Sequence, residues 1–314
     1  MNSIKDCPVT VDDVNLAERI YGPDVASIKG KATRSRPKPV VADIIEIPKE
    51  LVAAQHDVDM SIDTLFVNSM PFLATISHSI KYRTCHFVPS RRMVDYRSVL
   101  AKVVMLYLNA GFKIKMIHAD SEYKAVLEEF KEGSTKIPYN LATANEHVPQ
   151  AERNICDIKE RVRATYHSLP FKAIPKLFIK ELVMETANKL NFFPPKNGVS
   201  QYYSPREILS HQRLDYDKHC TIPQFSYVQA YDEPKPKNSQ APRSLDCIYL
   251  RPTNNIQGGL VLYHFGTKAV ITRRKVKVIP IAASVIEAVE RLAKADGIQS
   301  FVLHNKDGTS KEVL

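Results

Sequence analysis

Glycine is scarce in this chain, tryptophan is absent, and no apolar run is long enough to cross a membrane. Only 10 of the 314 residues are glycine, and neither a GxGxxG nor a GxxxxGK[ST] segment occurs. Such segments cradle phosphate groups in dinucleotide enzymes and P-loop ATPases, so we expect no small-molecule cofactor. A membrane-spanning helix needs about 18 or more apolar residues, and the start, MNSIKDCPVT, has no signal-peptide core. We therefore expect an unsecreted, intracellular protein that contacts no membrane.

Paired cysteines are also missing. The five cysteines are an odd number without a CxxC pair, which argues against a disulfide framework and against a zinc knuckle. The ten histidines are scattered, and pairs such as His78 with His86 lack cysteine partners at zinc spacing. We expect reduced thiols and no zinc site.

Positive charge is in excess, with 44 lysines and arginines against 34 acidic residues, a formal charge of +10. A basic surface gains free energy by releasing counterions from a phosphate backbone. Many soluble proteins are equally basic, so charge favours a nucleic-acid partner without establishing one. The length exceeds one average domain and predicts one large domain with small modules beside it.

The region after residue 50 alternates short apolar runs with turn signals and then with helical patterns. Runs of this kind predict strands, and apolar residues at helical spacing predict helices. Strands are expected at 62–67, 72–77, 82–88, 112–118 and 137–142, and helices at 92–109, 121–131 and 151–166. The order predicts an α/β fold in which a mixed sheet with an antiparallel start is flanked by helices.

The flanking regions are smaller. A short helix capped by Thr10 is expected to end near Tyr21, before Gly22, and a basic linker follows at 33–39. A long helix is expected at 175–190, short β-rich runs between 227 and 279 predict a small barrel or meander, and a final helix is expected at 283–294. The predicted organisation is an N-terminal segment at 1–50, a core domain at 51–200, a connection at 201–235, a β module at 236–282 and a C-terminal helix and tail at 283–314.

Two carboxylates belong to strand-like runs of the predicted core. Asp63 lies within an apolar strand, where a carboxylate is costly unless it is paired or bound to metal. Asp120 follows the end of the 112–118 strand, where ligand sites gather in open α/β sheets. Asp57 and Asp59 lie just upstream of Asp63, and we favour Asp63 because it alone lies inside the predicted apolar run; Asp59 remains the alternative.

Glu152 opens the basic helix predicted at 151–166. At 100° per residue, Lys159 and Arg163 lie within roughly 20° of it around the helix axis, so an acid and two cations share one face. With Asp63 and Asp120, Glu152 makes three acids from separate elements, as a site for two divalent ions on DNA requires. Plainer interpretations remain open: Glu152 as a solvated residue favouring the helix dipole, and Asp120 as an ordinary helix cap.

Several segments resemble the integrases of copia-type retrotransposons. NEHVPQAERNI at 145–155 with KERVRATYHSLPF at 159–171 resembles the helix carrying the third carboxylate, DTLFVN with MPFL at 63–73 resembles the first catalytic strand, and HADSE at 118–122 resembles the second. NGVS and SPREILSHQ at 197–212 resemble the segment after the core, and GGLVLY with TRRKVKVIP at 258–280 resembles the β module. The resemblance covers about 50–282.

The resemblance implies an RNase H-like core that binds two Mg²⁺ or Mn²⁺ ions through Asp63, Asp120 and Glu152. It implies an integrase that trims the 3′ ends of element DNA and joins them to target DNA, as a homo-oligomer acting in the nucleus, encoded within a Pol polyprotein. Candidate contacts to DNA phosphate are Lys159, Arg163, Arg153, Arg273, Arg274 and Lys275. Two other readings remain: a DNA-binding remnant without catalysis, and a nuclease of the same fold that cuts without joining.

Overall fold

The computed structural model describes residues 6–31, 44–133, 136–143, 148–231, 240–255, 257–304 and the backbone of 310–313. The basic linker predicted at 33–39 lies outside these residues. The chain forms two compact units. We call the one built from 43–214 and 288–314 the core unit, and the one built from 1–42 and 215–287 the β unit.

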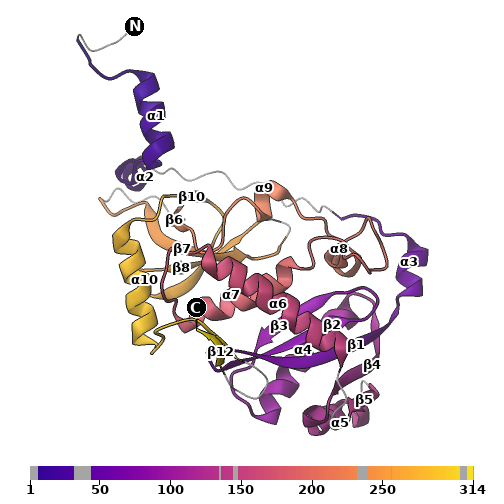
Figure 1. The fold of residues 1–314 in the computed structure, drawn as a ribbon. Coiled ribbons are helices and arrows are strands. Elements are labelled where there is room, and N and C mark those ends of the chain that lie inside the picture. The colour runs from indigo at the N-terminus through magenta and orange to yellow at the C-terminus, as the bar shows by residue number, and fades with distance from the viewer. Residues whose placement is uncertain are drawn as a thin grey trace. The chain divides into compact units, whose positions relative to one another are not determined.

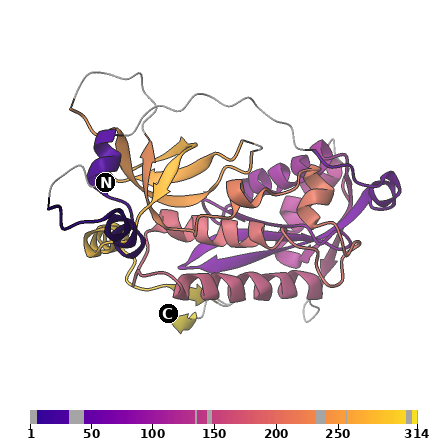
Figure 2. The ribbon, with the colours of Figure 1, turned by 90° about the horizontal axis from the view of Figure 1, so that it is seen from above.

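The core unit is a mixed sheet with helices (Figures 1 and 2). Its strands are β1 Asp57–Val67, β2 Met70–Ser77, β3 Arg83–Phe87, β4 Lys113–Asp120, β5 Tyr139–Ala142, β11 Val302–His304 and β12 Ser310–Val313. Its helices are α3 Lys49–Ala54, α4 Met93–Asn109, the 3-10 turn η1 Ser121–Tyr123, α5 Lys124–Glu132, α6 Pro149–His167, α7 Lys176–Lys189 and α8 Pro205–Ser210. The helix α10, Ala283–Ala295, begins in the β unit and ends in the core unit.

The strand order defines the fold. β3, β2 and β1 are antiparallel neighbours, while β4 pairs with β1 in parallel and β5 with β4 in parallel. This order, 3-2-1-4-5 with three antiparallel strands first, is that of an RNase H-like sheet. The predicted fold class is therefore confirmed, including the small β module described below. β11 and β12, which the sequence pattern did not reveal, extend the sheet at the C-terminal end of β1, where Val67 pairs with Leu303.

The two faces of β1 have different partners. Met60 and Ile62 belong to an apolar cluster with α4, α5, β4 and α8, in which Tyr107 and Phe112 are almost fully buried. Because side chains alternate along a strand, Ser61, Asp63 and Leu65 lie on the other face, where α6 packs on β1 and β2. Figures 1 and 2 together place α6 and α4 on opposite sides of the sheet.

β1 is longer than predicted. The sequence pattern places its start at Ile62, but the strand begins at Asp57, because Asp57–Ser61 pair in parallel with β4. Asp57 and Asp59 therefore also lie inside the strand, so membership of β1 does not by itself distinguish Asp63 from Asp59. Pairing through backbone groups does not require an apolar side chain, so a polar strand start gives no hydrophobic signal.

α6 and α7 close the second face of the sheet. α6 starts with Pro149 in its first turn and buries Ala151, Asn154, Ile155, Ile158, Val162 and Tyr166. α7 packs on β3 and α6. Just after α7, the buried amide of Asn191 accepts from the Arg83 N–H and donates to the Arg83 carbonyl, each at 2.8 Å. A side-chain amide thus replaces the strand that the edge of β3 lacks at this position.

The β unit contains the second sheet, with strand order β10-β6-β7-β8-β9, all antiparallel. The strands are β6 Tyr227–Tyr231, β7 Ser244–Pro252, β8 Leu260–His264, β9 Ala269–Arg273 and β10 Val276–Val278, and the short helix α9 Tyr216–His219 precedes them. The predicted N-terminal helix is confirmed as α1 Val11–Tyr21, with Thr10 and Asp13 forming a capping box, and α2 Val25–Lys31 follows.

In the part of the chain that the structure describes, none of the helices combines the length and the apolar character needed to cross a membrane.

Candidate active site

Asp63 and Asp120 meet at the junction of β1 and β4. Together with Glu122 they form a group in which one carboxylate oxygen of each residue lies within 4.8 Å of one oxygen of the other two. Asp63 is buried, with 3% of its surface exposed, and its Oδ1 accepts from the Thr64 N–H at 2.7 Å. The parallel pairing of β4 with β1 brings the end of β4, and thus Asp120, beside the middle of β1.

The donor set suits a hard divalent cation. Carboxylate oxygens are the ligands that Mg²⁺ and Mn²⁺ prefer, and neighbouring carboxylates repel one another unless a cation or a proton compensates their charge. Asp63, Asp120 and Glu122 thus fit a hard divalent metal ion.

Glu122 was missed by the sequence analysis. It lies in η1, directly after β4, and is exposed. The only signal for it is its position two residues after Asp120, which by itself is a common feature of exposed turns.

Glu152 lies in the first turn of α6 and is exposed. It does not belong to the group of acids within 4.8 Å. It does lie on the helix that covers the Asp63 face of β1, and near its N-terminal end Asn154 donates to the Thr75 carbonyl of β2 at 3.3 Å. The structure therefore brings together two of the three predicted carboxylates and places the third on the adjoining helix.

A cleft of about 640 Å³ adjoins the carboxylates. Its wall includes Thr64, Arg91, Tyr96, Glu122 and Tyr123. The Thr64 hydroxyl donates to the Tyr96 hydroxyl at 3.1 Å and forms a short hydrogen bond with the Tyr123 hydroxyl. Burial, and then the nearby charge of Asp63, raise the pKa of Tyr123 well above its usual value, so this phenol stays protonated and neutral.

Arg91 is a further cation at the cleft that the sequence did not single out. It is exposed, and its guanidinium lies 4.6 Å from the centre of the Phe66 ring. A guanidinium held over an aromatic face keeps its hydrogen-bond donors available at the ring's edge. It is therefore placed to contact an anionic group in the cleft.

The predicted phosphate contacts of α6 have partners within the protein. Lys159 is half-buried and donates to the His304 carbonyl of β11 at 2.7 Å, while Arg153 pairs with Asp157 at 2.9 Å. Arg163 is half-buried. In the β unit, Arg273 is the last residue of β9, and Arg274 and Lys275 follow it. Arg274 and Lys275 are exposed, and the Lys275 ammonium lies 4.7 Å from the centre of the Tyr231 ring.

Among the solved structures similar to this chain is the catalytic core domain of BIV integrase. It matches over 49% of this chain and 93% of that chain, with 13% sequence identity and a TM-score of 0.35. No protein-family model matches the sequence, and no curated protein does. The assignment of an RNase H-like sheet rests on the strand order of the core unit.

Proposed function

We propose that this protein is a metal-dependent polynucleotidyl transferase, a retroelement integrase of the copia type that processes the 3′ ends of element DNA and joins them to target DNA. One observation carries the proposal: Asp63 and Asp120, separated by 56 residues in the chain, meet at the β1–β4 junction of an RNase H-like sheet. A buried aspartate in an interior strand is costly, and metal-dependent chemistry gives it a use.

Glu152 is the third carboxylate in this proposal. It lies on α6, which packs on the face of β1 that carries Asp63. Asp63, Asp120 and Glu152 would hold and orient Mg²⁺ or Mn²⁺ ions, which would supply stabilisation of the attacking and leaving oxygens of an in-line phosphoryl displacement. Glu122 borders the DNA path.

Cations around the carboxylates hold the DNA backbone. Lys159, Arg163 and Arg153 on α6 contact phosphate near the reacting bond, and Arg273, Arg274 and Lys275 of the β unit also contact DNA. The protein acts on chromosomal DNA in the nucleus as a homo-oligomer, and it derives from a Pol polyprotein.

The test is a strand-transfer assay with Mg²⁺ on blunt DNA ends, comparing the natural chain with Asp120→Asn and Asp63→Asn. Both substitutions remove ligand charge and leave the basic contacts in place. We expect each to abolish joining while the affinity for DNA stays nearly unchanged. Asp57→Asn is the matched control, because Asp57 lies on the same strand but is exposed at its start.

The outcomes separate the three candidate functions. Full joining activity in Asp120→Asn contradicts the proposed site. Cutting without joining by the natural chain identifies a nuclease of the same fold, and DNA binding without either reaction identifies a remnant that has lost catalysis.

A further inference from the structure

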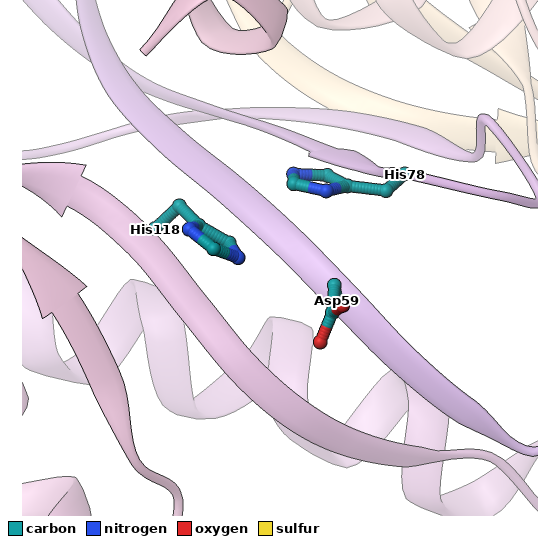
Figure 3. A group of neighbouring side chains, drawn as sticks. All are labelled: Asp59, His78 and His118. Carbon is teal, nitrogen blue, oxygen red and sulfur yellow. The ribbon is translucent and has the colours of Figure 1, made fainter. Parts of the chain in front are cut away.

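A second group of metal-ligand side chains lies on the Asp63 face of the sheet, next to the carboxylates. It consists of Asp59 on β1, His78 directly after β2 and His118 on β4, and the ligand atoms of the three all lie within 4.8 Å of one another. Figure 3 shows the two imidazoles approaching each other across β1, with Asp59 on β1 itself. None of these residues has a role in the proposed transferase.

Backbone pairing fixes where the three residues lie. The His78 N–H donates to the Asp59 carbonyl at 2.8 Å, and His118 is the partner of Ser61 in the parallel pairing of β4 with β1. The β1–β4 register shifts between Val58 and Asp59. Bulges of this kind redirect side chains and are frequent beside functional sites.

A hydrogen bond orients the ring of His78. The Ser61 hydroxyl lies 2.6 Å from His78 Nε2 and can accept from that nitrogen, which leaves His78 Nδ1 for a metal. A hydrogen bond on the second ring nitrogen is the usual arrangement of histidine ligands, because it orients the ring. The Asn140 amide nitrogen lies 3.4 Å from His118 Nδ1. Because an amide nitrogen only donates, His118 gives up this long contact when it binds a metal.

The two rings lie close together. Their centroids are 4.8 Å apart and their planes differ by 23°.

The surroundings of the Asp59 carboxylate independently favour a bound cation. Its Oδ1 is buried and has no hydrogen-bond partner among the described residues. An unpaired buried carboxylate oxygen is costly, and the cost disappears when the oxygen coordinates a cation.

We propose that Asp59, His78 and His118 form a binding site for one Zn²⁺ ion, separate from the carboxylates that hold Mg²⁺. Two imidazoles and one carboxylate are a ligand set that zinc uses and that Mg²⁺ does not prefer. Ligand atoms of a tetrahedral zinc site with bonds of about 2.1 Å lie about 3.4 Å apart. The ligand atoms of Asp59, His78 and His118, which lie within 4.8 Å of one another, therefore need to approach by little more than about 1 Å to bind the ion. Water fills the fourth position.

The bound ion ties β1, β4 and the segment after β2 together. His118 lies two residues before Asp120 on β4, or about 7 Å along a strand. The ion therefore fixes the end of β4 against β1, next to the place where Asp120 meets Asp63. This inference does not depend on the transferase activity, because metal binding is its readout.

Titration of the metal-free full chain with Zn²⁺, and with Co²⁺ as a spectroscopic probe, tests the site. We expect one equivalent of Co²⁺ to bind with the visible absorption of a four-coordinate ion, and Zn²⁺ to displace it and raise the Tm. His78→Gln and His118→Gln should weaken binding at least about 100-fold, and Ser61→Ala about 10-fold, since outer hydrogen bonds contribute less than ligands. Circular dichroism establishes that each variant folds.

Two controls locate the ion. His86→Gln replaces another half-buried histidine, on β3, and should leave binding unchanged. Asp120→Asn should also retain Co²⁺ binding, even though it abolishes strand transfer. Binding lost in Asp120→Asn but kept in His78→Gln would place the ion at the carboxylates and overturn the proposal. Absence of stoichiometric binding by the folded natural chain would overturn it as well.

Discussion

Asp63 has buried and mostly apolar neighbours on β1, and only 3% of its surface is exposed. Burial, and then the nearby charge of Asp63, raise the pKa of Tyr123. Asp120 and Glu122 lie within ligand distance of it. At this scale the open question is which acid completes the site, Glu122 or Glu152.

Glu152→Gln and Glu122→Gln answer that question when compared in one assay. We expect Glu152→Gln to lower the rate of strand transfer by about 100-fold or more, because misplaced reacting groups cost rates of that order. Glu122→Gln should keep the rate within several-fold, because Glu122 is an exposed turn residue in our proposal. Rates are measured with Mg²⁺ at saturating DNA, and the reverse pattern would assign the third ligand to Glu122.

Asn191, just after α7, connects that end of the helix to the edge strand β3. Its side-chain amide satisfies both backbone groups of Arg83 at the edge of β3. Replacing it with leucine leaves these groups without partners, and we expect the free energy of unfolding to fall by about 2–3 kcal/mol, as for a buried polar group left unsatisfied. Urea denaturation measures the change. Lys189→Ala, at the exposed end of α7, is the control, and an equal loss there would contradict this explanation.

The ion pair between α2 and β7 predicts an acid-dependent stability in the β unit. Burial raises the pKa of Asp246, but hydrogen bonds from Lys29, Tyr227 and Gln229 outweigh it, so the pKa lies below its usual value of 3.8. A carboxyl with a lowered pKa stabilises the folded state above its unfolded pKa and loses that effect as the pH falls through the folded pKa.

Lys29→Met should therefore reduce the free energy of unfolding by roughly 0.5 kcal/mol at pH 6, a value kept small because both side chains are partly exposed. The difference from the natural chain should shrink as the pH falls below 3.8. Denaturant titrations followed by tyrosine fluorescence measure it. Lys268→Met, which replaces an exposed cation between β8 and β9, should show no such dependence.

The whole molecule carries a formal charge of +10, and DNA binding should therefore weaken steeply with salt. Arg274→Ser removes an exposed cation of the proposed DNA-binding segment and should reduce the slope of log K against log salt by about 1. Fluorescence anisotropy with duplex DNA measures the slope. Lys294→Ser, an exposed cation of α10, is the control with the same loss of charge, and an equal effect there would show that only net charge matters.

Periodicity in the sequence was sufficient for most of the core sheet. The helices α4, α6 and α7 and the strands β2 to β5 fall close to their predicted ranges, because apolar residues repeat there at helical or strand spacing. The start of β1 and the strands β11 and β12 were not predictable in this way. Their pairing depends on backbone groups of distant segments, which leave no periodic signal.

The sequence by itself indicated the class of sheet, the basic character, and Asp63 and Asp120 as separate candidate residues, because apolar periodicity and charge are local properties of a chain. The tertiary structure alone decided that Glu122 joins the two aspartates. It also decided that Asp59, His78 and His118 converge, although no spacing rule for zinc connects them. Parallel pairing of β4 with β1 joins residues more than 50 positions apart, and only the folded chain reveals that proximity.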